Sequence, residues 1–142
     1  MYDLKLFEII ILMVSLELKH LICDFYLQMP FEYMWKNKGR SVNWFWPLFF
    51  HSSVNAFGLL VVFVVFTYTF YQLTLDLLLT IIILSLIDLF SHFMVDRWKA
   101  TQPYNIYRTE FWINVGVDQA AHKIINISLA FYLLLDLNNF VQ

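Results

Sequence analysis

Asp88-Leu-Phe-Ser-His92-Phe-Met-Val-Asp96-Arg-Trp-Lys99 is the stretch that decides how this chain folds. The side chains of Asp88, His92 and Asp96 recur every four residues, a spacing that places them on one face of an α-helix. An apolar run, Leu77 to Ile87, precedes them. A carboxylate inside lipid is stable only when it is paired, bound to a metal or hydrated. This face therefore predicts a functional site within a membrane-spanning helix.

The composition also indicates a membrane protein. Hydrophobic residues make up 61% of the 142 residues and charged residues 14%, so the chain has too little polar surface to cover a water-soluble globule of this size. The net charge of −2, without a basic arm, gives no indication of nucleic-acid binding. We expect one all-α domain over residues 1–142, embedded in the lipid bilayer of the cell (inner) membrane.

Four stretches have the length that a bilayer core requires, roughly twenty residues. We predict membrane spans at about 6–27, 47–70, 75–96 and 111–135, packed as an antiparallel four-helix bundle. Pro47 suits the first turn of the second span, and Thr74 can cap the third. The N-terminus has no small-residue cleavage site, which favours a retained first span over a signal peptide.

Basic residues predict the orientation of the spans. The connections at 29–46 and 97–110 lie on one side of the membrane, and all five tryptophans lie at that side too. The basic residues of these connections are Lys36, Lys38, Arg40, Arg97, Lys99 and Arg108. Because positively charged loops tend to remain in the cytoplasm, both termini are expected outside.

Polar side chains within the spans lie near the same side. At a rise of about 1.5 Å per residue, the four histidines, one in each span, lie roughly 5 to 17 Å from the basic ends of the helices. Four aspartates share this layer. The histidines are His20, His51, His92 and His122, and the aspartates are Asp24, Asp88, Asp96 and Asp118. Facing side chains in bundle interiors commonly form metal or cofactor sites, so we expect these groups to converge.

Imidazole and carboxylate groups together suit Zn, Mn or Fe. We predict one or two divalent ions, with these ligands: His20, His51, His92, Asp96 and His122. The candidate catalytic acids and bases are Asp24, Asp88 and Asp118. The candidate substrate-binding residues are Lys99, Gln28 and Asn55, of which Lys99 would hold an anionic head group. Lys19 lies off the polar stripe of its helix, so we expect its ammonium group to snorkel to the interface.

The order of these motifs resembles the bacterial and phage membrane family called domain of unknown function 3307. The resemblance runs from Lys19 to about Asn126. It rests on His20-x-x-x-Asp24-Phe25-x-x-Gln28, a loop with Trp35-Lys36-Asn37-Lys38, His51-x-x-x-Asn55, His92-x-x-x-Asp96-x-x-Lys99 and Asp118-Gln119-x-x-His122. It implies a compact four-span helical protein, distantly similar to membrane-bound metal-dependent hydrolases. Relatives often carry a second histidine where this sequence has Asn55, so a mechanism that needs that ligand does not carry over.

We therefore predict metal-dependent hydrolysis of a membrane-associated substrate, with an anionic lipid or lipid-linked molecule as the expected class. Two alternatives stay open. The same acids and histidines can relay protons or metal ions through the membrane. Otherwise the chain is a non-catalytic accessory subunit of a membrane complex, and its polar layer only joins helices. As protein partners we expect further copies of this chain in a homo-oligomer, or the subunits of a larger membrane complex.

Overall fold

The computed structural model describes residues 6–27, 44–102 and 105–140. Its elements in chain order are α1 (Leu6–Leu21), the π-helical turn η1 (Ile22–Tyr26), α3 (Phe45–Phe70), α4 (Leu75–Thr101) and α5 (Thr109–Phe140). Within these ranges no strand occurs. The all-α prediction is therefore confirmed.

Three helices are long and apolar enough to cross a membrane, namely α3, α4 and α5. They contain 26, 27 and 32 residues, more than the roughly 20 that a bilayer core requires. The α1 helix has 16 residues and continues directly into η1, so the two together end at Tyr26. That this first segment also spans the bilayer stays a prediction.

The ends of α4 follow from local sequence. Thr74 is extended, and its side-chain oxygen accepts a hydrogen bond from the Leu77 backbone N–H at 3.3 Å, which confirms the predicted cap. The helix continues beyond the predicted end at 96 as far as Thr101. It stops where Gln102 becomes extended, because the residue before a proline avoids the helical conformation and Pro103 follows.

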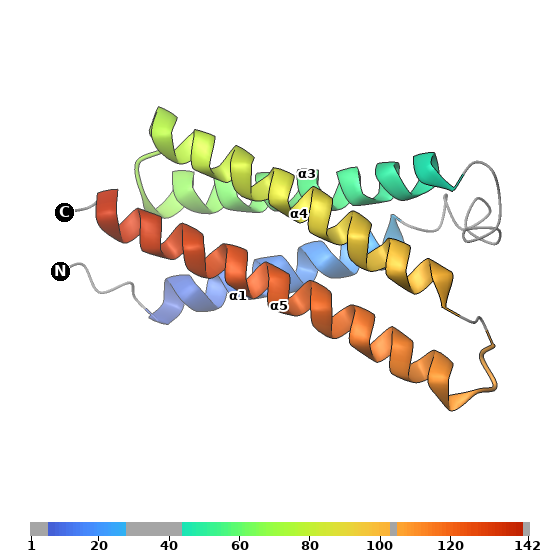
Figure 1. Ribbon diagram of the computed structural model, residues 1–142. Helices are drawn as coiled ribbons and strands as arrows, with labels where there is room; N and C mark the ends of the chain where they lie inside the picture. Colours follow the sequence, from blue (N-terminus) through green and yellow to red (C-terminus); the bar gives the residue numbers. More distant parts are fainter. Residues whose placement is uncertain (1–5, 28–43, 103–104, 141–142) are drawn as a thin grey trace.

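The helices run antiparallel in succession. Figure 1 shows α3 and α4 side by side, α5 next to α4, and α1 in the layer of α5. Leu6, where α1 begins, and Phe140, where α5 ends, lie at the same end of the bundle (Figure 1). At this end the Tyr71 hydroxyl donates a hydrogen bond to Glu8 at 2.9 Å, which joins α1 to the turn after α3.

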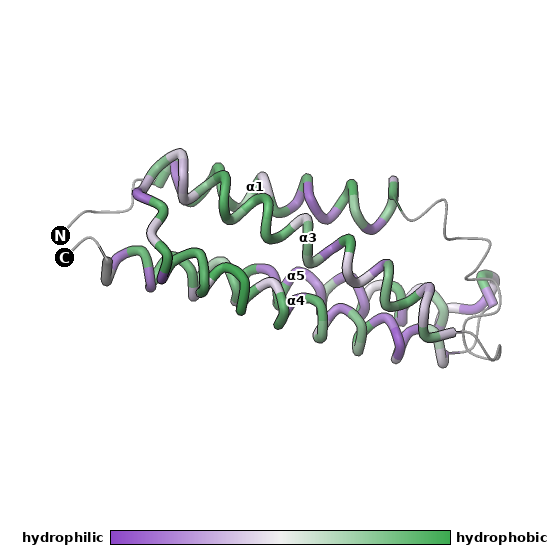
Figure 2. The backbone as a smooth tube through the Cα atoms, turned by 90° about the horizontal axis from the view of Figure 1, so that it is seen from above, coloured by the Kyte–Doolittle hydropathy of each residue, from purple (hydrophilic) through white to green (hydrophobic). Residues whose placement is uncertain are grey.

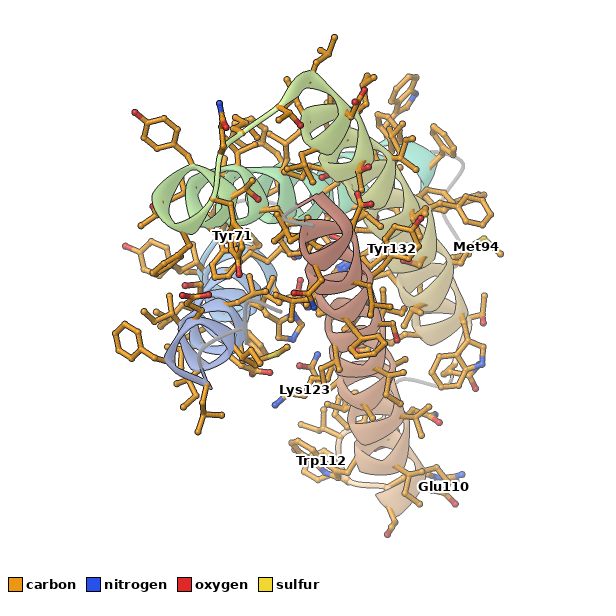
Figure 3. All side chains as sticks on the ribbon, turned by 90° about the vertical axis from the view of Figure 1, so that its left-hand side faces the viewer. Tyr71, Met94, Glu110, Trp112, Lys123 and Tyr132 are labelled. Carbon is orange, nitrogen blue, oxygen red and sulfur yellow. The ribbon has the colours of Figure 1, made fainter. Side chains whose placement is uncertain are left out.

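The two halves of the bundle differ in chemistry. Apolar side chains from all four α-helices, including Leu12, Phe63, Ile81 and Leu133, form the buried core of the half near the termini. In the other half, hydrophilic residues of α4 and α5 gather (Figure 2). Large apolar residues also cover the outside, as Met94 does in Figure 3. Such a surface is unusual for a soluble monomer and suits contact with lipid.

Candidate metal centre

The four histidines form one connected group in the bundle interior, although each comes from a different α-helix. His92 of α4 stacks on His122 of α5 with ring centroids 3.9 Å apart. On either side of this pair, His51 of α3 lies 5.1 Å from His92 and His20 of α1 lies 5.9 Å from His122. All four are buried. The predicted common layer is therefore present.

Four candidate ligand atoms from three segments lie close together around the pair of His51 and His92. Asp24 Oδ1 lies 3.5 Å from His51 Nε2 and 3.2 Å from His92 Nε2. Asp96 Oδ2 lies 3.3 Å and 3.6 Å from the same two nitrogens, which are 3.3 Å from each other. A tetrahedral ion with ligands at about 2.0–2.1 Å has ligand–ligand distances of about 3.3–3.4 Å. These five distances, 3.2 to 3.6 Å, lie within about 0.3 Å of that value, so each carboxylate oxygen is placed to share an ion with the two imidazoles.

This arrangement places more acceptor atoms together than the available protons can satisfy. The Nε2 atoms of His51 and His92 face each other, and one proton at most can lie between them. Both nitrogens also face carboxylate oxygens, which can only accept hydrogen bonds. Among the described residues, the buried Asp96 Oδ2 has no hydrogen-bond partner. Such atoms are what a cation at the centre would satisfy. Within the described residues, two groups have ligand atoms close enough together to hold an ion. The first group consists of Asp24, His51 and His92.

The second group adds His122 to His92 and Asp96. His122 Nε2 lies 3.5 Å from Asp96 Oδ1 and 3.4 Å from Asp118 Oδ1. The other oxygen of Asp118 accepts hydrogen bonds from Lys99 Nζ and, at 3.1 Å, from Gln119 Nε2. Because the Lys99 side chain is 36% exposed, this residue connects the buried cluster to the surface of the protein.

Asp24 is held by neighbours besides the candidate ligands. Asn55 Nδ2 donates a hydrogen bond to its Oδ1 at 2.7 Å, and His20 Nδ1 lies 3.4 Å from its Oδ2. His20 Nε2 in turn lies 3.0 Å from the Gln119 side-chain oxygen. His20 and Asn55 thus contact a ligand from outside both groups, as supporting residues around metal sites do. The ligand role of His20 and the substrate-binding role of Asn55 stay predictions.

The expectation for Lys19 was wrong. Its side chain does not snorkel to the interface but is buried, with Nζ 3.2 Å from Asp88 Oδ2. Gly58 provides the space, since a Cβ there would lie 3.1 Å from Lys19 Cγ. Asp88, predicted as a catalytic residue, is thereby paired with a cation and lies outside both ligand groups. A buried aspartate needs a counter-charge, and this requirement is the sequence signal that could have identified Lys19 as the partner of Asp88.

The π-helical turn η1 was not predicted. Its backbone hydrogen bond runs from Leu27 N–H to Ile22 C=O, five residues back, and Asp24 lies in the middle of the turn. Such turns are frequent at functional sites because they reorient individual side chains. Gln28, the remaining predicted site residue, lies outside the described residues.

Comparison with known proteins gives one match. A family model with the description "Protein of unknown function (DUF3307)" matches residues 11–141, a range that contains every histidine and aspartate of the cluster. No curated protein and no solved structure matches the chain.

Proposed function

The chain belongs to the DUF3307 family, and we propose that it binds a divalent metal ion (Zn, Mn or Fe) within its helix bundle and uses it to hydrolyse a membrane-associated substrate. The observation that carries this proposal is the convergence of Asp24 Oδ1, His51 Nε2 and His92 Nε2, which lie close enough to hold one ion, with Asp96 Oδ2 beside the same two imidazoles. Two imidazoles with carboxylates are a ligand set suited to such ions.

The charges of the cluster support a divalent ion. Among the described residues, the lysines paired with the four buried aspartates are two, Lys19 on Asp88 and Lys99 on Asp118. With neutral histidines, four carboxylates and two ammonium groups leave a charge of −2. Uncompensated charge inside a low-dielectric bundle is strongly unfavourable, and one divalent cation would neutralise it. Two protonated histidines would do the same, so metal analysis is decisive.

Hydrolysis requires one ligand position to be available to water. Asp24 is the ligand that can leave, because Asn55 and His20 remain as its partners when it does. Asp24 would act as the general base that accepts a proton from water, and a divalent ion held by the neighbouring histidines and Asp96 would supply positive charge to stabilise the substrate. Lys99, partly exposed beside Asp118, would bind an anionic head group.

The location of the cluster favours an enclosed site over an ion-conducting path. In the described half of the bundle near the termini, the interior is filled by apolar side chains such as Leu59, Phe63 and Leu133, all completely buried. A conductor needs polar groups or water through this region as well. The proposal therefore retains the hydrolase and sets the conductor aside.

Metal analysis of the protein purified in detergent tests the binding step. We expect about one divalent ion per chain, lost in His51→Ala and His92→Ala. Asn126→Ala is the matched control, since Asn126 is a buried polar residue of α5 outside both ligand groups. Wild-type protein that holds no stoichiometric metal after supply of Zn, Mn and Fe would overturn the proposal.

Activity is tested separately with vesicles of anionic phospholipid, by release of the head group. Asp24→Asn should retain much of the metal and lose most of the hydrolysis, because an amide cannot accept the proton from water. Equal hydrolysis by wild type and Asp24→Asn would exclude the role given to Asp24.

A further inference from the structure

We propose that the centre takes a second divalent ion, together with a phosphate group of the substrate, at a position formed by His122, Asp118 and Asp96. This inference rests on the proposed function, because Asp96 would bridge the second ion to the first. It names the substrate class as phosphate esters.

The second position is lined by buried side chains that lie close together. His122 Nε2 lies 3.4 Å from Asp118 Oδ1 and 3.5 Å from Asp96 Oδ1, distances like those around the first position. His122 is 3% exposed and Asp118 0%. Within the described part of the chain, His122 Nε2 and Asp118 Oδ1 have no hydrogen-bond partner. Two buried carboxylate oxygens, from Asp118 and Asp96, therefore lie near His122 Nε2, and the atoms of His122 and Asp118 are unsatisfied.

The two positions share Asp96. Its Oδ2 faces His51 and His92, whereas its Oδ1 faces His122. A carboxylate that uses both oxygens in this way can hold two ions at the separation of about 3.5–4 Å that is usual in two-metal hydrolytic sites. The stacking of His92 on His122 at 3.9 Å keeps the two ligand sets side by side.

Charge determines what must accompany the second ion. One divalent ion already neutralises the four aspartates and two lysines of the cluster. A second ion would leave an excess of positive charge, so an anion must enter with it. The position has three protein ligands, which leaves coordination sites for that anion. Lys99 Nζ, on the far oxygen of Asp118, is a partly exposed cation beside this position. Two-metal sites with an adjacent cation stabilise phosphoryl oxygens particularly well.

Metal stoichiometry tests the proposal. Purified protein is equilibrated with Mn²⁺, with and without inorganic phosphate, and bound metal is counted after removal of free ions. We expect about one ion per chain without phosphate and two with it, the second accompanied by an electron paramagnetic resonance signal from coupled Mn²⁺ ions. One ion in both conditions, or two in both, would overturn the proposal. No bound ion in any condition would instead refute the proposed function.

Variants locate the second ion. His122→Ala and Asp118→Asn should each remain at one ion when phosphate is added, with helicity by circular dichroism like that of wild type. Two variants are used so that misfolding of one does not decide the outcome. If both folded variants still take up two ions, the second position is not at these residues.

Nanodiscs identify the source of the phosphate. Discs of phosphatidylcholine with phosphatidic acid, and no added phosphate, present only a lipid head group. Two ions there indicate a lipid phosphate as substrate. Two ions with inorganic phosphate but one with phosphatidic acid indicate a soluble phosphate ester. One ion in both arms contradicts the proposal.

Discussion

His51 Nε2 and His92 Nε2 lie 3.3 Å apart in the bundle interior, although 41 residues separate them in the chain. The reason is the hairpin of α3 and α4. Each histidine lies about 20 residues from the turn at 71–74, so an equal rise along two antiparallel helices brings both to the same depth. Asp24 from η1 and Asp96 from α4 then complete the set around them.

Removal of the metal should lower the stability of the protein. The ion binds the folded state only, and at a free concentration about 100 times its dissociation constant it would contribute about 2.7 kcal/mol. Thermal unfolding followed by tryptophan fluorescence, with and without a chelator, measures this contribution. His51→Ala should unfold at one temperature in both conditions. A wild-type protein whose unfolding temperature does not change when the chelator is added would contradict the expectation.

Gly58→Ala should destabilise the fold. A Cβ at this position would lie 2.9 Å from Cys23 Sγ and 3.3 Å from Lys19 Cε, and the Lys19 side chain cannot move aside while it is paired with Asp88. We expect a loss of about 1–3 kcal/mol in the free energy of unfolding. Gly116→Ala is the matched control, because no atom lies within 4 Å of its Cβ position. It should be neutral or stabilising by up to about 1 kcal/mol.

Lys19→Met should be more harmful than the same change at Lys123. It leaves Asp88 buried without its cation, at a cost of about 3–5 kcal/mol in the free energy of unfolding. The double variant Lys19→Met, Asp88→Asn should recover part of this loss. Lys123 pairs with Glu17 on the surface, where Figure 3 shows it at the edge of α5, and Lys123→Met should cost less than about 1 kcal/mol. If the two single variants lost equal free energy of unfolding, the buried pair would stabilise the fold no more than the surface pair does.

Tyr71 should make the protein less stable at high pH. Partial burial, and then its hydrogen bond to Glu8, raise the pKa of the Tyr71 hydroxyl above its usual value of 10.0. Above pH 10 the unfolded chain therefore loses a proton that the folded chain keeps, and stability falls as pH rises. Denaturation at about pH 9 and about pH 11 should show a smaller fall in Tyr71→Phe than in wild type. A fall of equal size in both would assign the effect to other groups.

The depth of the site could be predicted from sequence, but the partners of its residues could not. Depth depends only on residue counts along helices, so the four histidines fall into one layer as expected. Which side chains pair with one another depends on how each helix is rotated about its axis and on the size of individual neighbouring side chains. Lys19 reaches Asp88 because Gly58 lacks a side chain, and the backbone of η1 widens at Asp24 without any distinctive residue there.

The orientation of the bundle provides the last prediction. The end of α4, which carries Arg97 and Lys99, and the start of α5, which Arg108 precedes, lie opposite to the start of α1 and the end of α5 (Figure 1). Positive loops would therefore place the termini outside. Single cysteines test this in a Cys23→Ser background, which removes the one native thiol of the chain. A maleimide that cannot cross membranes should label Gln142→Cys in intact cells. It should label Arg108→Cys, whose position is exposed in the structure, only after the membrane is permeabilised. The reverse pattern would place the metal centre near the outer face and would exclude access from the cytoplasm.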